Sequence, residues 1–243
     1  MVAALEGCGL RQAAQKLWDW RAGAAWEGPP REPTVTKKRE PLAPLGFRLR
    51  GVDPRHPYLS SRGIEEATAI EFGVGFYAGP GLMSRRVVIP VHDAAGRLVA
   101  YCGRSCDGRQ PRYKFPPGFA KSQVLFNLHR AAATGSSTVI VVEGFFDCLK
   151  VHQAGFVCVV ALMGSVLSEP QRQRLLRFRE VILLLDGDVA GRRAAAAIAA
   201  QLGSVCDARG IDLDDNVQPD QLSSETLSEL LVQKGGRPQV YRS

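Results

Sequence analysis

The feature that most constrains the fold is an alternation of short apolar runs and helical segments from about residue 138 onward. Three apolar runs rich in β-branched residues predict strands, and the segments after them predict helices. The strands are expected at Val139–Val142, Val157–Ala161 and Val181–Leu185, and the helices at Phe146–Gln153, Glu169–Phe178 and Gly191–Leu202. Such alternation favours an α/β fold in which a parallel sheet is flanked by helices and binds ligands beyond the carboxyl ends of its strands.

The rest of the chain is organised differently. Residues 1–22 predict a short amphipathic helix, and the breaker-rich residues 23–44 are typical of a linker. Residues 45–133 predict a smaller α+β domain, with two short helices near residues 58–72 and a β-hairpin formed by residues 86–91 and 97–101. Residues 134–209 hold the α/β segment, and residues 210–243 form a C-terminal extension.

Three carboxylates stand where the predicted strands end. Glu143 follows the first strand, Asp186 and Asp188 follow the third, and Gly144 and Gly187 allow sharp turns beside a ligand. If the two strands are neighbours, the acids converge and repel one another unless cations neutralise them. Hard oxygen ligands select Mg²⁺ or Mn²⁺, and a pair of ions suits phosphoryl transfer. The alternative for any one such acid is a helix N-cap or a solvated loop position.

An excess of basic residues indicates a polyanionic partner. The formal net charge is +7, from 31 Lys and Arg against 24 Asp and Glu. Many of the basic side chains gather in residues 85–121, interleaved with aromatic rings that can stack on bases or pack in a core. The members are Arg85, Arg86, Arg97, Arg104, Arg109, Arg112, Lys114 and Lys121, with Tyr113 and Phe115. For any single Arg, a solvated surface position is an equally good interpretation.

Composition also argues against several protein classes. No apolar run is long enough to cross a bilayer, and the N-terminus has no apolar signal-peptide core, so we expect a cytoplasmic protein without a membrane partner. Only Cys102 and Cys106 lie close together among the six cysteines. Four ligands are needed for a structural zinc site, so no zinc is expected.

The acidic motifs resemble those of a Toprim domain of the bacterial-primase type. The resemblance rests on Val139–Asp147, Ala161–Gly164 and Leu185–Ala195, and it covers about residues 138–202. It implies that Glu143 is a metal ligand or general acid/base, and that Asp186 and Asp188 are metal ligands. Supporting roles are implied for Gly144, Asp147, Gly187 and Arg192. Gln218-Pro219-Asp220 is similar to a family Asp-Pro-Asp, so only Asp220 is carried over as a further metal ligand.

The preceding region, about residues 58–130, is similar to the basic subdomain that precedes Toprim in bacterial-type primases. This similarity implies contacts with template or incoming nucleoside triphosphates, with phosphate charge neutralised by fixed cations. The residues concerned are Arg85, Arg86, Arg104, Arg112, Tyr113, Lys114 and Lys121. Residues 1–22 resemble the tail of the family's zinc-binding module, whose Cys and His ligands are missing here.

The resemblance as a whole implies a DNA primase-like core, a nucleotidyltransferase that makes short RNA primers on single-stranded DNA with Mg²⁺ or Mn²⁺. A separate zinc-module or helicase protein is a candidate partner. Two alternatives stay open: a Toprim nuclease in which the same ions activate water, and a catalytically weak nucleic-acid-binding accessory of a mobile element or plasmid. A topoisomerase is disfavoured, because the chain is too short to supply a strand-passage gate.

Overall fold

The structure is a computed structural model that describes residues 42–203, 205–233 and 235–236. These residues belong to one of two compact units of the chain, Leu42–Ser243. The helix predicted in residues 1–22 and most of the predicted linker lie outside the described residues. Along the described ranges, no helix combines the length and hydropathy that a bilayer-spanning segment needs.

An antiparallel sheet forms the first part of the unit, and it contains the predicted hairpin. Its strands are β1 (Val52–Asp53), β2 (Gly75–Tyr77), β3 (Arg86–His92), β4 (Leu98–Arg104) and β5 (Tyr113–Lys114), paired in that order. The hairpin of β3 and β4 turns at Asp93, whose backbone N–H donates to the Arg97 carbonyl at 2.9 Å. Helices α3 (Pro57–Ser61) and α4 (Glu66–Phe72) precede it, as predicted.

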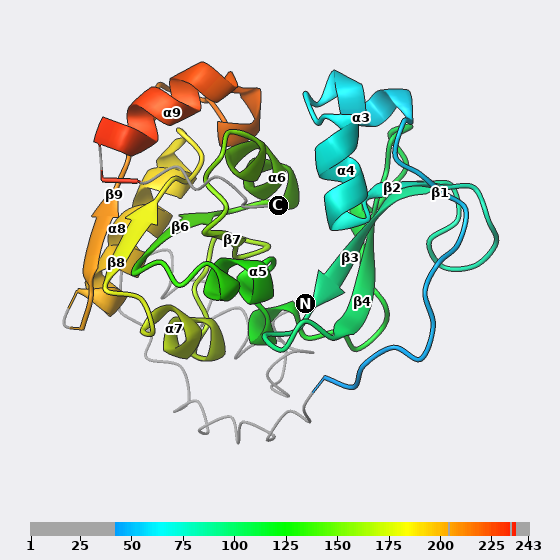
Figure 1. Cartoon of the computed structure of the whole chain (residues 1–243), viewed down its shortest axis with the longest axis horizontal. Helices are drawn as coiled ribbons and strands as arrows, with labels where there is room; N and C mark the ends of the chain where they lie inside the picture. The colour runs from blue at the N-terminus through cyan, green and yellow to red at the C-terminus, as the bar shows by residue number, and fades with distance from the viewer. Residues whose placement is uncertain (1–41, 204, 234, 237–243) are drawn as a thin grey trace, which may run out of the picture. The chain divides into compact units, whose positions relative to one another are not determined.

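A parallel sheet forms the second part, which confirms the predicted α/β architecture (Figure 1). Its strands are β6 (Thr138–Val142), β7 (Val159–Ala161), β8 (Glu180–Leu183) and β9 (Asp207–Gly210), in the order β7-β6-β8-β9. Strand β9 was not predicted, because its short, charged sequence at the edge of the sheet lacks an apolar run. The central pair, β6 and β8, brings the predicted acidic motifs to the same edge.

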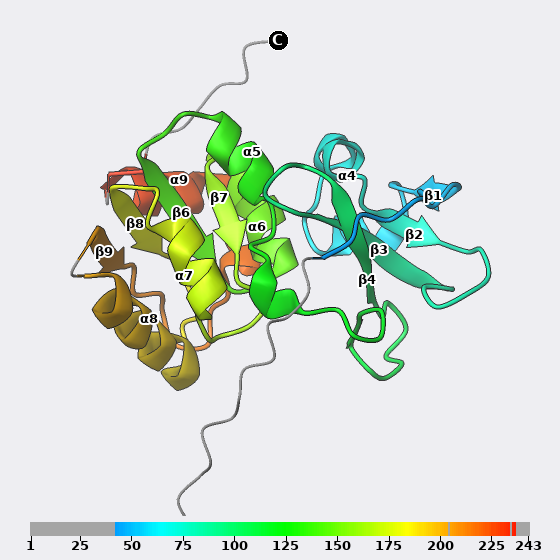
Figure 2. The ribbon, with the colours of Figure 1, turned by 90° about the horizontal axis from the view of Figure 1, so that it is seen from below.

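Alternating side chains of the parallel sheet pack into two apolar layers. Ile140 and Ile182 face a layer that includes α6 (Phe145–Gln153) and α9 (Ser224–Gln233). Val139 and Val181 face a layer that includes α5 (Leu128–Ala133), α7 (Glu169–Leu175) and α8 (Val189–Leu202). Figure 2 shows α7 and α8 on the opposite side of the sheet from α9. The sheet is thus covered on both faces, as parallel sheets require.

The first of these layers also contains side chains of the antiparallel sheet, including Val87 and Ile89. Phe126 lies between the two parts: its ring centroid is 5.9 Å from that of Phe72 and 4.9 Å from that of Phe145. Its backbone also pairs with Ala161 at the end of β7. The two sheets therefore share one apolar core.

Candidate active site

A pocket of about 280 Å³ lies at the carboxyl ends of β6 and β8. Acidic and amide side chains from the parallel-sheet part and the C-terminal segment form the acidic wall of this pocket. Basic side chains in the lining come from the preceding part, and aromatic rings come from both parts. The polar and aromatic lining residues are Arg62, Arg112, Tyr113, Phe115, Lys121, Glu143, Phe145, Phe146, Asp147, Asp186, Gln218 and Asp220.

Glu143 and Asp186 meet at this pocket because their strands are hydrogen-bonded neighbours. The ladder continues past the end of β8, where Leu184 N–H donates to the Val141 carbonyl at 2.9 Å. Asp186 N–H then lies 3.4 Å from Glu143 Oε1. Burial raises the pKa of Glu143 to about 7, and the Asp186 carboxylate adds to the rise. Burial also raises the pKa of Asp186, against the opposing effect of a Gln218 hydrogen bond.

Asp147 lies in the first turn of α6 and is held there by hydrogen bonds from two backbone N–H groups. Its Oδ2 accepts a 2.9 Å bond from Gly144 N–H, and its Oδ1 accepts a 3.1 Å bond from Asp220 N–H. Burial raises the pKa of Asp147 to about 7, and the charge of Asp186 adds to the rise. Asp147 thus joins the β6–α6 turn to the C-terminal segment.

Asp188 is placed differently from the other two predicted ligands. It is the N-cap of α8, and its Oδ1 accepts a 2.6 Å bond from Gly191 N–H. It is outside the lining of the pocket. Within the part of the chain that the structure describes, no three His, Cys, Asp or Glu side chains are arranged to hold one metal ion together. The structure thus brings Glu143 and Asp186 together and uses Asp188 as a helix cap.

Gly187 lets the C-terminal segment approach the turn between Asp186 and Asp188. Its N–H donates to the Val217 carbonyl at 2.8 Å, and its carbonyl accepts from Asn216 N–H at 3.0 Å. A Cβ at position 187 would collide with the Asp214 carbonyl oxygen and lie 3.0 Å from that of Val217. Glycine at position 187 is therefore required by the close approach of the backbone at Asp214 and Val217.

Arg192 also connects the C-terminal segment to the turn after β8. Its guanidinium donates to the Gly187 carbonyl at 2.9 Å and to Asp215 Oδ1 at 2.6 Å. Asp215 is exposed, so the ion pair itself contributes little to stability. The role predicted for Arg192 is therefore one of holding two loops together.

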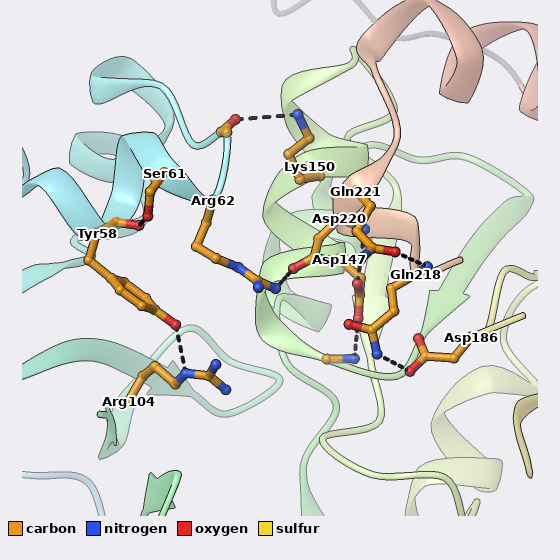
Figure 3. A network of polar contacts seen from close by, with 12 residues as sticks. Tyr58, Ser61, Arg62, Arg104, Asp147, Lys150, Asp186, Gln218, Asp220 and Gln221 are labelled. Carbon is orange, nitrogen blue, oxygen red and sulfur yellow. Dashed lines mark hydrogen bonds and ion pairs between the residues drawn. The ribbon is translucent and has the colours of Figure 1, made fainter. Parts of the chain in front are cut away.

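Asp220 is buried and forms an ion pair with Arg62 (Figure 3). Arg62 ends α3, and its guanidinium lies 5.4 Å from the ring centroid of Phe146. Asp220 Oδ1 has no hydrogen-bond partner within the described residues. Arg62 was not among the predicted site residues, because its partner lies 158 positions away in the sequence. The only local signal is the Arg62-Gly63 helix end, where Gly63 has a φ of 67°.

Gln218 also belongs to the site. It precedes the short 3₁₀ helix η2 (Pro219–Gln221). Its side-chain Nε2 donates to Asp186 Oδ2 at 2.7 Å, and its backbone N–H donates to Gln221 Oε1 at 2.7 Å. The sequence placed Gln218 where the family carries an acid, but the contact with Asp186 became visible only in three dimensions.

The predicted basic residues divide into two groups. Arg112, Tyr113 and Lys121 line the pocket; Lys121, which begins the 3₁₀ helix η1 (Lys121–Gln123), also donates through Nζ to the Met163 carbonyl at 2.9 Å. Arg85, Arg86, Arg104 and Lys114 lie outside its lining. Of these, only Arg85 is exposed.

Two of the latter group serve the fold. Arg86 is buried and donates to the carbonyls of Gly103 and Pro111 at 3.3 and 2.9 Å. Arg104 donates to the Tyr58 hydroxyl at 2.8 Å, and its guanidinium lies 4.7 Å from the ring centroid of Tyr113. Arg104 thus reaches the pocket indirectly, by packing against one of its lining rings.

The acidic wall fits a hard divalent cation. Its donor atoms are oxygens, and burial together with neighbouring carboxylates raises the pKa values of Glu143 and Asp186, which a bound cation would oppose. The unpartnered Oδ1 of Asp220 is a further buried oxygen at the same pocket. These residues therefore match the chemistry of an Mg²⁺ or Mn²⁺ site better than that of a zinc site.

Comparison with known protein families finds matches to two successive domains. A family model for the Toprim domain matches residues 137–212, and one for the N-terminal domain of the DNA primase catalytic core matches residues 80–132. The chain is 38% identical over 143 residues to a DNA primase of Synechococcus elongatus, covering 54% of this chain and 20% of the relative. It is 31% identical over 186 residues to a DNA primase of Clostridium acetobutylicum, covering 72% and 31% respectively. The chain thus spans a third or less of these relatives.

Solved structures give the same result. The chain resembles a DnaG primase catalytic domain bound to single-stranded DNA, with 27% identity and a TM-score of 0.64, covering 74% of this chain and 71% of that one. It resembles a DNA primase domain from Pseudomonas aeruginosa with 27% identity and a TM-score of 0.63, covering 73% and 70%. The Toprim primase family is metal-dependent. Residues 80–212 therefore carry an N-terminal primase-core domain followed by a Toprim domain, the domain pair of a bacterial-type DNA primase catalytic core.

Proposed function

We propose that this chain synthesises short RNA primers on single-stranded DNA, as a metal-dependent nucleotidyltransferase. The observation that carries the proposal is the mixed lining of the pocket, which combines the carboxylates of Glu143 and Asp186 with the basic side chains of Arg112 and Lys121. A cation site beside fixed positive charges suits a triphosphate, whose negative charge must be neutralised at several oxygens.

In this reaction, a 3′-hydroxyl oxygen forms a bond to the α-phosphorus of a nucleoside triphosphate, and the bond from that phosphorus to the bridging oxygen breaks. Pyrophosphate leaves, and the hydroxyl proton passes to solvent or a nearby base. Glu143 and Asp186 would hold Mg²⁺ or Mn²⁺, which supplies charge neutralisation at the reacting phosphate when bound. Asp188 and Asp220 are the further ligands that the family resemblance proposes.

The chain's own side chains would position the substrates. Arg112 and Lys121 would pair with phosphate oxygens, and the rings of Tyr113 and Phe115 in the same lining would contact a base. The net charge of +7 favours a nucleic-acid template. A related primase catalytic domain bound to single-stranded DNA supports the same proposal.

The test is incubation of the chain with single-stranded DNA, Mg²⁺ or Mn²⁺, and four ribonucleoside triphosphates of which one is labelled. Labelled oligomers are expected, and Glu143→Gln should abolish them. Glu225→Gln is the matched control, because it removes the same charge from an exposed position in the first turn of α9. Shortened DNA without labelled oligomers would indicate a nuclease instead, and salt-sensitive DNA binding without turnover would indicate a silent binding module.

A zinc-module or helicase protein is the partner we propose for template recognition. Adding such a protein to the same assay should increase primer yield at limiting template. An unchanged yield over a wide range of partner concentrations would contradict the partnership.

A further inference from the structure

We infer that Gln218 is a positioning residue of the acidic wall, one that orients Asp186 by a hydrogen bond and keeps the wall less negative than a carboxylate would. The inference deepens the proposed function and rests on it. It concerns how tightly this particular pocket holds a divalent cation.

The backbone of Gln218 has a fixed place. Gly187 and residues 214–217 are joined by backbone hydrogen bonds, so the segment lies directly on the turn that carries Asp186. On the other side, the Gln221 side chain accepts from Gln218 N–H, and Asp220 N–H donates to Asp147. The backbone at position 218 is therefore held from both directions.

The side chain of Gln218 contacts Asp186 directly. Because the segment is fixed, the carboxamide of Gln218 reaches Asp186 and donates from Nε2 to Oδ2 at 2.7 Å (Figure 3). An amide that donates to one carboxylate oxygen restricts the rotation of the carboxylate and leaves its other oxygen for a ligand. Partners of this kind set the affinity of metal ligands, and removing one commonly costs about 10- to 100-fold.

The neutral side chain of Gln218 also affects the charge of the acidic wall. Gln218 lines the same pocket as Glu143, Asp147, Asp186 and Asp220. Arg62 already neutralises part of this wall through its ion pair with Asp220. A neutral side chain at position 218 adds a hydrogen-bond donor without adding to the repulsion, whereas a carboxylate there would add both a ligand oxygen and negative charge. Divalent-cation affinity rises with the number of charged ligands.

Substitutions at position 218 can test two effects separately: the hydrogen bond that orients Asp186 and the charge of the side chain. Gln218→Glu keeps the shape, replaces the donor with an acceptor and adds a charge. Gln218→Met keeps a similar length and removes the donor without adding charge. Gln221→Glu is the matched control: it adds the same charge three positions away, on an exposed side chain whose oxygen can still accept from Gln218 N–H.

The experiment is a titration of the full chain with Mn²⁺, in which the free ion is followed by electron paramagnetic resonance. Gln218→Glu should lower the Mn²⁺ dissociation constant about tenfold, since it adds a charged ligand. Gln218→Met should raise it about tenfold, since Asp186 loses its orienting partner. The Mn²⁺ dissociation constant of Gln221→Glu should stay close to that of the unsubstituted chain. Thermal unfolding without Mn²⁺ establishes whether each variant is folded. If Gln218→Glu is unfolded, Gln218→Asp replaces it, and if Gln218→Met is unfolded, Gln218→Leu replaces it.

Opposite shifts for the two Gln218 variants support the inference. Shifts in the same direction, or a Gln218→Glu shift no larger than that of Gln221→Glu, overturn it. The readout does not depend on catalysis. If the opposite shifts occur but no variant makes labelled oligomers, the inference about Gln218 stands and the proposed primer synthesis fails.

Discussion

The β6–α6 turn and the β8–α8 turn are built from similar sequence and use their acids differently. In the first, Gly144 occupies the N-cap position, so the carboxylate of Glu143 stays in the pocket. In the second, Asp188 is itself the N-cap, and its Oδ1 is committed to Gly191 N–H. The residue at which the helix begins therefore decides whether an acid after a strand caps the helix or lines the site.

The largest expected effect on this comparison comes from Glu143→Gln. The substitution removes the charge of an acid that lies in the pocket, so primer synthesis should fall by about 100-fold or more, a loss typical for a group that organises charge in a transition state. Steady-state rates in Mg²⁺ and in Mn²⁺ would measure it. Retention of more than half the rate in both ions would show that the pocket does not need this carboxylate.

Replacing the glycine of each turn should have unequal effects on stability. Gly187→Ala places a Cβ against the backbone carbonyls of Asp214 and Val217, which cannot move aside easily. In Gly144→Ala, the Cβ meets a single side-chain atom, Asp147 Oδ2 at 2.7 Å, which would have to shift within its hydrogen bond from Gly144 N–H. We expect a loss of about 2 to 3 kcal/mol for Gly187→Ala and a smaller loss for Gly144→Ala. Equal urea-unfolding midpoints would contradict this difference.

The capping role of Asp188 predicts a smaller change. Asp188→Ala should lower the free energy of unfolding by about 1 kcal/mol, and Asp188→Asn should retain most of it, because an amide oxygen can still accept from Gly191 N–H. Chemical denaturation measures both. If Asp188→Asn is as stable as the unsubstituted chain but loses primer synthesis, the loss reports cation binding and not capping.

The smallest expected effect is a dependence on pH that is independent of both turns. Burial, with the charge of Arg130, lowers the pKa of His129 from 6.5 to about 4. Its contribution to stability is present above pH 6.5 and is lost as the pH falls toward 4, because the unfolded chain binds the proton more readily. His129→Asn should flatten the stability curve in this window, and Glu225→Gln should not. Identical curves for His129→Asn and the unsubstituted chain would show that other groups carry the acid sensitivity.

Much of the fold followed from local patterns. Apolar runs predicted β6, β7 and β8, and their spacing predicted a parallel sheet, because each side of a buried strand must be covered. Helix α9 was missed, although Leu227 and Leu231 face the core at helical spacing. Strand ends also located Glu143 and Asp186. In contrast, the positions of Arg62 and Gln218 depend on which distant loop returns to the sheet edge, and no local periodicity encodes that return.

The aromatic contacts of Phe126 have a consequence for how substrates enter. Because its ring packs between Phe72 and Phe145, and its backbone is paired with Ala161, the antiparallel-sheet part and the parallel-sheet part are joined through a common apolar core. Widening the gap between them would expose that core to water. We therefore expect the pocket to keep a nearly constant width, so that a nucleotide would bind without the two parts moving apart.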